Sequence, residues 1–216
     1  GKMTMTGYNE LYLNDARKNL GEMIEYAVVD LGYKPDEFFD YFITSGIADK
    51  FGKGNPKYTV GMSGIELAES VLKEVGIEIK VKECDHTGYK GIAYWSGWIL
   101  AYYQWKTGRR FEDIADNGLT LSKVFSMYIL HEADDSKFVE TADEIIARNR
   151  AKQKSKLSVI RKARGFTQSE LARVSGVSLR MIQLYEQKQN DIRKAQVDTV
   201  LALCKALGCD IEDLIG

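Results

Sequence analysis

The stretch TQSELARVSGVSLRMIQLYEQ, residues 167–187, decides the fold of the C-terminal part of the chain. It predicts two short helices joined by a tight turn. Thr167 and Glu170 form a T-x-x-E capping box, in which each side chain binds a backbone N–H that the first helical turn leaves unpaired. Gly176 stands at the turn, where glycine adopts a left-handed conformation without steric cost. Ser178 is placed to cap the second helix.

The second helix of this stretch has an inward and an outward face. Ile182 and Tyr185 are spaced to pack inward, whereas Leu179, Arg180 and Gln183 point elsewhere. Two helices joined in this way are typical of a helix-turn-helix, in which the second helix enters the major groove of DNA.

The flanking segments extend the pattern to about residues 155–216. A short helix is predicted before the stretch, and VDTVLALCKALGCDIEDLIG, residues 197–216, predicts helix after it. The succession Thr-Gln-x-Glu-Leu-Ala, Gly-Val-Ser, Ile-x-x-Tyr-Glu and Leu-x-Leu-Cys-x-Ala-Leu-Gly-Cys resembles the Cro/C1-type (XRE) repressor family. The resemblance implies a five-helix DNA-binding domain. A helix-turn-helix that has become a protein-binding or dimerisation module is the alternative.

The resemblance also implies roles for individual side chains. Gln168 is expected to bind a phosphate, and Ser178 to contact the DNA backbone. Arg180 suits a guanine, because a guanidinium binds O6 and N7 in a bidentate way, while Gln183 suits an adenine and Leu179 a thymine methyl group. Lys188 completes the predicted DNA-binding set. Leu179 and Met181 depart from the polar recognition helices of many relatives.

Charge is distributed unevenly along the 216 residues. The net charge is -1, yet residues 152–216 contain twelve Lys or Arg and seven Asp or Glu, a net +5, and the remainder carries -6. A basic segment beside an acidic one predicts that the first binds nucleic acid and the second does not. Hydrophobic content of 44% and charged content of 28% are ordinary for a globular protein.

The N-terminal part predicts a mainly α fold. Apolar residues recur at helical spacing over residues 8–31, 63–75, 92–105 and 120–130, and Pro35 followed by Asp36 and Glu37 suits the start of another helix. Residues 77–84, IEIKVKEC, alternate and predict a strand, one arm of a small β-hairpin. Thr141 to Glu144 resembles another capping box. We therefore divide the chain into a helical partner-binding domain, a basic linker or helix and the DNA-binding domain, at residues 1–140, 141–156 and 157–216.

Aromatic residues cluster in two places of the N-terminal domain. Either they form the core, or they anchor a protein partner, since Trp and Tyr dominate interface hot spots. The partner-binding interpretation selects Phe38, Phe39, Phe42, Trp95, Trp98 and Tyr102.

Motifs for catalysis and metal binding are incomplete. His131-Glu132 begins like H-E-x-x-H, but position 135 is Asp, and Cys84 with His86 lacks a second ligand pair. We expect no enzyme activity, no cofactor and no metal. Three cysteines without framework spacing indicate reduced thiols and a cytoplasmic protein. The longest apolar run, residues 92–105, is too short to span a bilayer.

Two functions fit these observations. The arrangement of an acidic helical domain before an XRE-type domain resembles antitoxins of type II toxin-antitoxin modules, which implies a cognate protein toxin, operator DNA and a homodimer on that DNA. The alternative is a transcriptional regulator whose N-terminal domain senses a small molecule, with the Trp/Tyr helix lining the pocket. For dimerisation, Ile211, Leu214 and Ile215 are candidates, although core packing accounts for them equally well.

Overall fold

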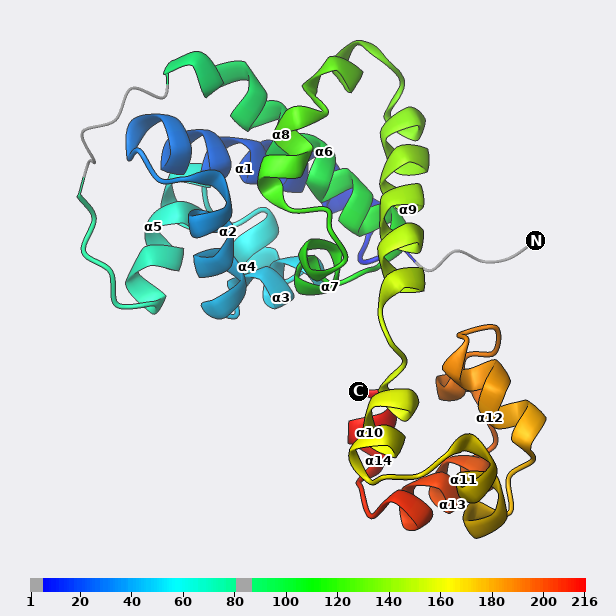
Figure 1. The fold of residues 1–216 in the computed structure, drawn as a ribbon. Coiled ribbons are helices and arrows are strands. Elements are labelled where there is room, and N and C mark those ends of the chain that lie inside the picture. Colours follow the sequence, from blue (N-terminus) through cyan, green and yellow to red (C-terminus); the bar gives the residue numbers. More distant parts are fainter. Residues whose placement is uncertain (1–5, 81–86) are drawn as a thin grey trace. The chain divides into compact units, whose positions relative to one another are not determined.

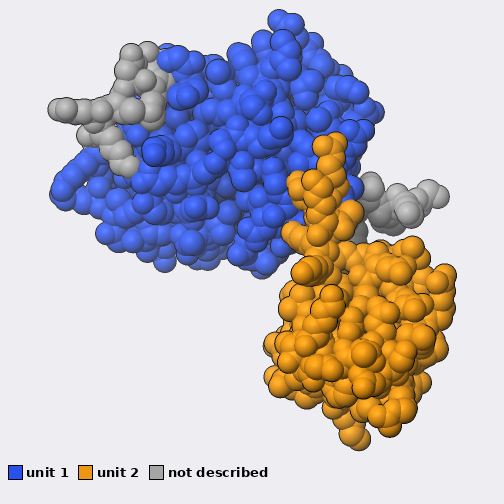
Figure 2. Space-filling view, viewed as in Figure 1, with its two compact units in different colours: residues 1–147 blue, residues 148–216 orange. Residues whose placement is uncertain are grey.

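The computed structural model describes residues 6–80 and 87–216, and within these ranges it is helical and contains no strand. Two compact units are present, Gly1–Ala147 and Arg148–Gly216, each with its own hydrophobic core (Figures 1 and 2). A mainly helical fold with a C-terminal five-helix domain was predicted from the sequence and is confirmed. None of the described helices is long and apolar enough to cross a membrane.

Two long helices that pack closely along each other form the centre of the N-terminal unit. They are α1, Leu13–Glu25, and α6, Lys90–Thr107. Glycine on each helix permits the close approach: a Cβ atom on Gly97 would lie 2.4 Å from the carbonyl oxygen of Leu20, and one on Gly21 would lie 2.9 Å from that of Tyr94. The tight contact buries the apolar stripes of both helices, which places the core along this line (Figure 1).

The other helices of this unit surround the central pair. α1 follows a short turn, Glu10–Tyr12, and continues into a π-helical segment, Tyr26–Asp30. The sequence signals at two helix starts are confirmed, because Pro35 occupies the first turn of its helix and Ser63 and Glu66 form a capping box. The remaining elements are α2 (Pro35–Thr44), α3 (Ile47–Gly52), α4 (Pro56–Thr59), α5 (Gly64–Glu74), η3 (Thr87–Tyr89), α7 (Phe111–Asp116), α8 (Leu121–Ser126), η4 (Tyr128–Glu132) and α9 (Asp135–Lys152).

Two local predictions differ from the structure. Residues 77–80 have no regular secondary structure, and the rest of the predicted strand, together with Cys84 and His86, lies outside the described residues. The helix expected to begin at Thr141 begins at Asp135, and the Thr141 hydroxyl donates to the carbonyl of Lys137 inside it at 2.9 Å. Because Phe138, Ala142 and Ile146 are buried in the N-terminal core, this unit extends beyond residue 140.

The C-terminal unit begins with the end of α9 and then contains five helices and one short turn. They are α10 (Lys156–Ala163), α11 (Gln168–Ser175), α12 (Leu179–Glu186), η5 (Ile192–Lys194), α13 (Val197–Leu207) and α14 (Ile211–Ile215). Every helix contributes to one core, which contains Leu157, Leu171, Ile182, Tyr185, Val200, Leu203, Cys204, Leu207 and Leu214. Ile211, Leu214 and Ile215 pack in or against this core, so their use is intramolecular.

Candidate nucleic-acid interface

The turn between α11 and α12 is built from the short-range interactions that the sequence predicts. Thr167 Oγ1 accepts from the N–H of Glu170 at 3.1 Å, and Glu170 Oε2 accepts from the N–H of Thr167 at 2.7 Å. Gly176 ends α11 in the left-handed conformation, with φ of 73°. Ser178 Oγ then accepts from the N–H of Met181 at 3.3 Å and starts α12. Caps and glycine together set the direction of the second helix.

The outward face of α12 carries the side chains predicted to contact bases. Ile182 and Tyr185 are buried against the core, as expected. Arg180 is exposed, Leu179 is 38% exposed and Gln183 is half-buried. Within the part of the chain that the structure describes, Arg180 forms no ion pair and no side-chain hydrogen bond, so its guanidinium keeps all its donors for a ligand.

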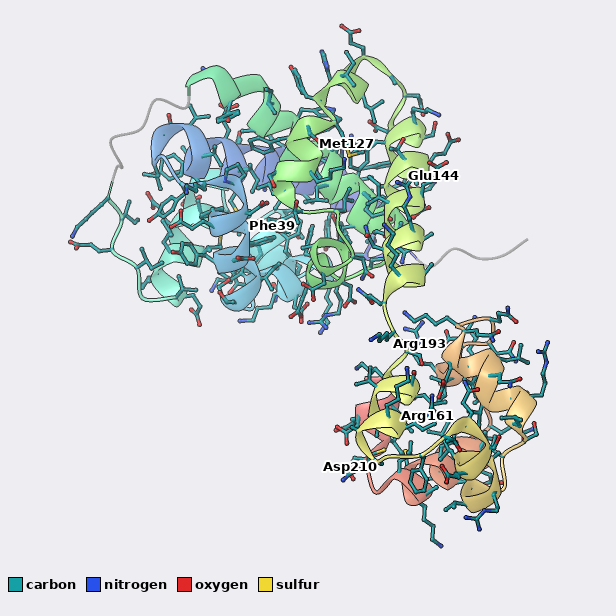
Figure 3. All side chains as sticks on the ribbon, in the orientation of Figure 1. Phe39, Met127, Glu144, Arg161, Arg193 and Asp210 are labelled. Carbon is teal, nitrogen blue, oxygen red and sulfur yellow. The ribbon has the colours of Figure 1, made fainter. Side chains whose placement is uncertain are left out.

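Gln168 is held in place by a buried ion pair that the sequence interpretation missed. Its Nε2 donates to Glu186 Oε2 at 2.8 Å. The same carboxylate accepts from Arg161, with Nε to Oε1 at 2.6 Å and Nη2 to Oε2 at 3.0 Å. An amide nitrogen carries two hydrogens, so one remains for the phosphate that Gln168 is predicted to bind. Arg161 is among the residues labelled in Figure 3.

Electrostatics make this network sensitive to protonation. Burial alone would raise the pKa of Glu186, but hydrogen bonds from Arg161 and Gln168 and the positive charge of Arg161 lower it below its usual value. The hydrogen bond to Glu186 in turn raises the pKa of Arg161. One signal in the sequence could have revealed the pair: Arg161 stands four residues after Leu157, on the inward face of α10, where a cation requires a buried acceptor.

Ser178 and Lys188 lie at opposite ends of α12. Ser178 is exposed at the N-cap, and its hydroxyl is already used to cap the helix. Lys188 follows α12 with φ of 56°, and its Nζ donates to the carbonyl of Arg150 at 2.6 Å within the same unit. The other basic groups of residues 148–216 outnumber the acidic ones, since this unit holds fourteen Lys or Arg and seven Asp or Glu. The unit therefore attracts phosphate as a whole.

The predicted partner-binding residues divide into two groups. Phe38, Phe39 and Phe42 are at most 2% exposed. Phe39 and Phe42 pack with Phe51 and Phe111, in edge and tilted contacts with ring centroids 5.4–6.2 Å apart. Phe38 packs against Tyr33, with ring centroids 6.0 Å apart. Assigning these three phenylalanines to a partner surface is wrong, because their side chains are buried in the core of the N-terminal unit. Phe39 is labelled in Figure 3, in the N-terminal unit.

The predicted partner-binding residues of α6, Trp95, Trp98 and Tyr102, are half-buried and contact neighbouring elements. Trp95 contacts Tyr128 and Phe138 edge-on, with ring centroids 5.7 and 5.8 Å apart. Trp98 and Tyr102 lie beside Arg17, whose guanidinium carbon is 4.2 and 4.8 Å from their ring centroids. These rings chiefly hold α6 against α1 and α9. Binding of a protein partner by their exposed parts stays a prediction.

Comparison with known proteins agrees with the geometry of the C-terminal unit. Residues 157–214 match the helix-turn-helix family model HTH_3, a span that runs from α10 into α14. No curated protein and no solved structure matched the chain. The C-terminal unit is thus an XRE-type helix-turn-helix domain, and the protein is a DNA-binding transcriptional regulator.

Proposed function

We propose that this protein is a repressor and the antitoxin of a type II toxin-antitoxin module, acting in the cytoplasm. Its N-terminal unit binds a cognate protein toxin, and its C-terminal unit binds the operator of the same operon as a homodimer. The observation that carries the proposal is the division into two separately cored units of opposite charge. Residues 148–216 carry a net +7, and residues 1–147, with sixteen basic and twenty-four acidic residues, carry -8.

The opposite charges favour separate partners for the two units. A surface with net negative charge is repelled by DNA and attracts a basic or nucleotide-binding protein. Among the described residues, each core cluster takes its side chains from one unit, so toxin binding and DNA binding need not use the same surface.

Co-expression of the full-length chain with the product of the neighbouring gene tests the toxin-binding role. Rescue of growth and a complex that survives purification are the expected results. The Arg180→Ala variant is the matched control, because it alters only the DNA-reading face and should rescue equally well. A stable chain that neither rescues growth nor binds the neighbouring product would contradict the antitoxin role.

An open depression beside α5 favours the second candidate function, regulation by a small molecule. It encloses about 790 Å³, and its lining includes Lys57, Met62, Glu66, Lys73 and Ile77. The aromatic residues of α6 do not line this depression, so a pocket lined by the Trp/Tyr helix stays a separate prediction. A metabolite that changes operator affinity of the full-length chain, without any protein partner, would favour this function over the first.

A further inference from the structure

The outer face of α13 exposes two apolar residues one helical turn apart. Val197 is 68% exposed and Leu201 is 45% exposed, whereas the opposite side of the helix is buried in the core. Asp198 and Lys205 are exposed beside them. Neither charge forms an ion pair within the described residues. We call these four residues the α13 face.

Helical geometry aligns the two charges of the α13 face. Asp198 and Lys205 are seven residues apart, which on a straight α-helix differs from two full turns by only about 20°. Leu201 lies between them, three residues after Asp198 and four before Lys205. The face therefore has an apolar centre with an anion toward the start of the helix and a cation toward its end.

We propose that the α13 face binds the same face of a second copy of this chain, with the two helices antiparallel. In this arrangement a two-fold axis passes near Leu201, so Leu201 packs against Leu201 of the second copy. Asp198 of each copy then lies level with Lys205 of the other. An isologous contact requires a surface that is self-complementary under two-fold rotation, and unlike charges placed evenly around an apolar centre satisfy that requirement. This inference rests on the proposed homodimeric binding of DNA.

The small size of the face determines when the dimer forms. One helix pair with two apolar side chains per copy buries much less than the roughly 1,200 Å² typical of stable interfaces. Association in free solution is therefore weak. An inverted repeat holds two copies at high effective concentration, so the contact forms mainly on DNA and appears as cooperativity between half-sites.

Charge reversal with rescue tests the pairing. The probe is a duplex that carries the inverted repeat selected from random-sequence DNA by the wild-type, full-length protein, and a duplex with one half-site is the reference. The ratio of full-site to half-site affinity measures cooperativity. The half-site affinity corrects for any change in the electrostatic attraction of the variant to DNA. Asp198→Lys and Lys205→Asp should each lower this ratio about ten-fold or more, because like charges then face each other. The double variant has the original net charge and should restore most of the ratio.

Leu201→Lys tests the apolar centre, with Val159→Lys as the matched control on α10, where Val159 is 51% exposed. Only the first should lower the ratio. A double charge variant that is no better than the single variants would show that the face docks elsewhere, for example on the N-terminal unit, and would overturn the inference while leaving the homodimer intact. If the wild-type protein binds the selected duplex as one copy, both the inference and the proposed homodimer fail.

Discussion

Arg161 and Glu186 form a bidentate ion pair that joins α10 to the end of α12. Their side chains are 8% and 6% exposed, and the pair also fixes Gln168 at the start of α11. Three helices thus share one carboxylate. A buried charge that loses its partner is left without compensation, so Glu186 helps to fix the position of α12 beside α10 and α11.

Glu186→Gln should destabilise the C-terminal unit by about 3–5 kcal/mol, because it leaves the Arg161 charge buried and unpaired. All three tryptophans lie in the N-terminal unit. Loss of helical circular dichroism without a change in tryptophan fluorescence would therefore identify unfolding of the C-terminal unit alone. Glu212→Gln, at an exposed carboxylate of α14, is the control and should change little. Equal stabilities of the two variants would contradict the role of the pair.

The same pair should give the C-terminal unit an acid-sensitive component of stability. The pKa of Glu186 is lowered in the folded protein. The stabilisation by the ionised Glu186 carboxylate is fully present above its pKa in the unfolded chain, about 4.3. It is lost as the pH falls through the lower pKa that this carboxyl has in the folded protein. The difference in unfolding free energy between wild type and Glu186→Gln should therefore shrink below about pH 4. A difference that stays constant with pH would show that folding does not shift the pKa of Glu186.

Arg180→Ala should lower specific DNA affinity by roughly 1–3 kcal/mol and leave nonspecific binding nearly intact. The reason is that the Arg180 side chain is exposed on α12 and has no ion pair or side-chain hydrogen bond among the described residues, so it can bind a guanine edge. Competition between the selected duplex and random-sequence DNA measures both affinities. Lys162→Ala, an exposed cation on α10, controls for the loss of charge. Equal losses on both DNAs would make Arg180 a phosphate contact only.

The DNA-bound form should be a homodimer on an inverted repeat with half-site centres about 34 Å apart, one turn of the double helix. One helix-turn-helix domain reads only a few base pairs, so two copies are needed for a specific site. Sedimentation of the complex measures the stoichiometry directly. Moving the half-sites apart by about five base pairs should abolish cooperative binding, since it turns one half-site to the opposite face of the duplex.

Gly97→Ala should destabilise the N-terminal unit by about 1–3 kcal/mol or more. The added Cβ would lie 2.4 Å from the Leu20 carbonyl oxygen and 2.8 Å from the Gly21 Cα, and neither backbone atom can move aside cheaply. Gly91→Ala on the same helix is the control, because its Cβ would meet the end of the Tyr128 side chain, with the hydroxyl oxygen at 3.1 Å and Cζ at 3.9 Å, and no backbone atom is among these contacts. Tryptophan fluorescence during urea unfolding measures the stability of both variants. Similar unfolding midpoints for Gly97→Ala and Gly91→Ala would show that α1 and α6 have room to move apart.

The sequence by itself determined the elements whose causes are local. The Thr167–Glu170 capping box, the Gly176 turn and the Ser178 cap are made within three or four residues, and all are present as predicted. The XRE-type domain could be recognised for the same reason, because its pattern combines several such signals at set spacings. The outward position of Arg180 also follows from helical period alone.

Only the tertiary structure decided which apolar and charged side chains meet. An aromatic run such as Phe38–Phe42 has the same pattern whether it forms a core or an interface, and its burial depends on α7, about seventy residues further along the chain. Arg161 and Glu186 are 25 residues apart, so their pairing exists only after α10 and α12 pack together. The face of α13 left uncovered is likewise a result of packing, because helical period defines a stripe but not the neighbour that covers it.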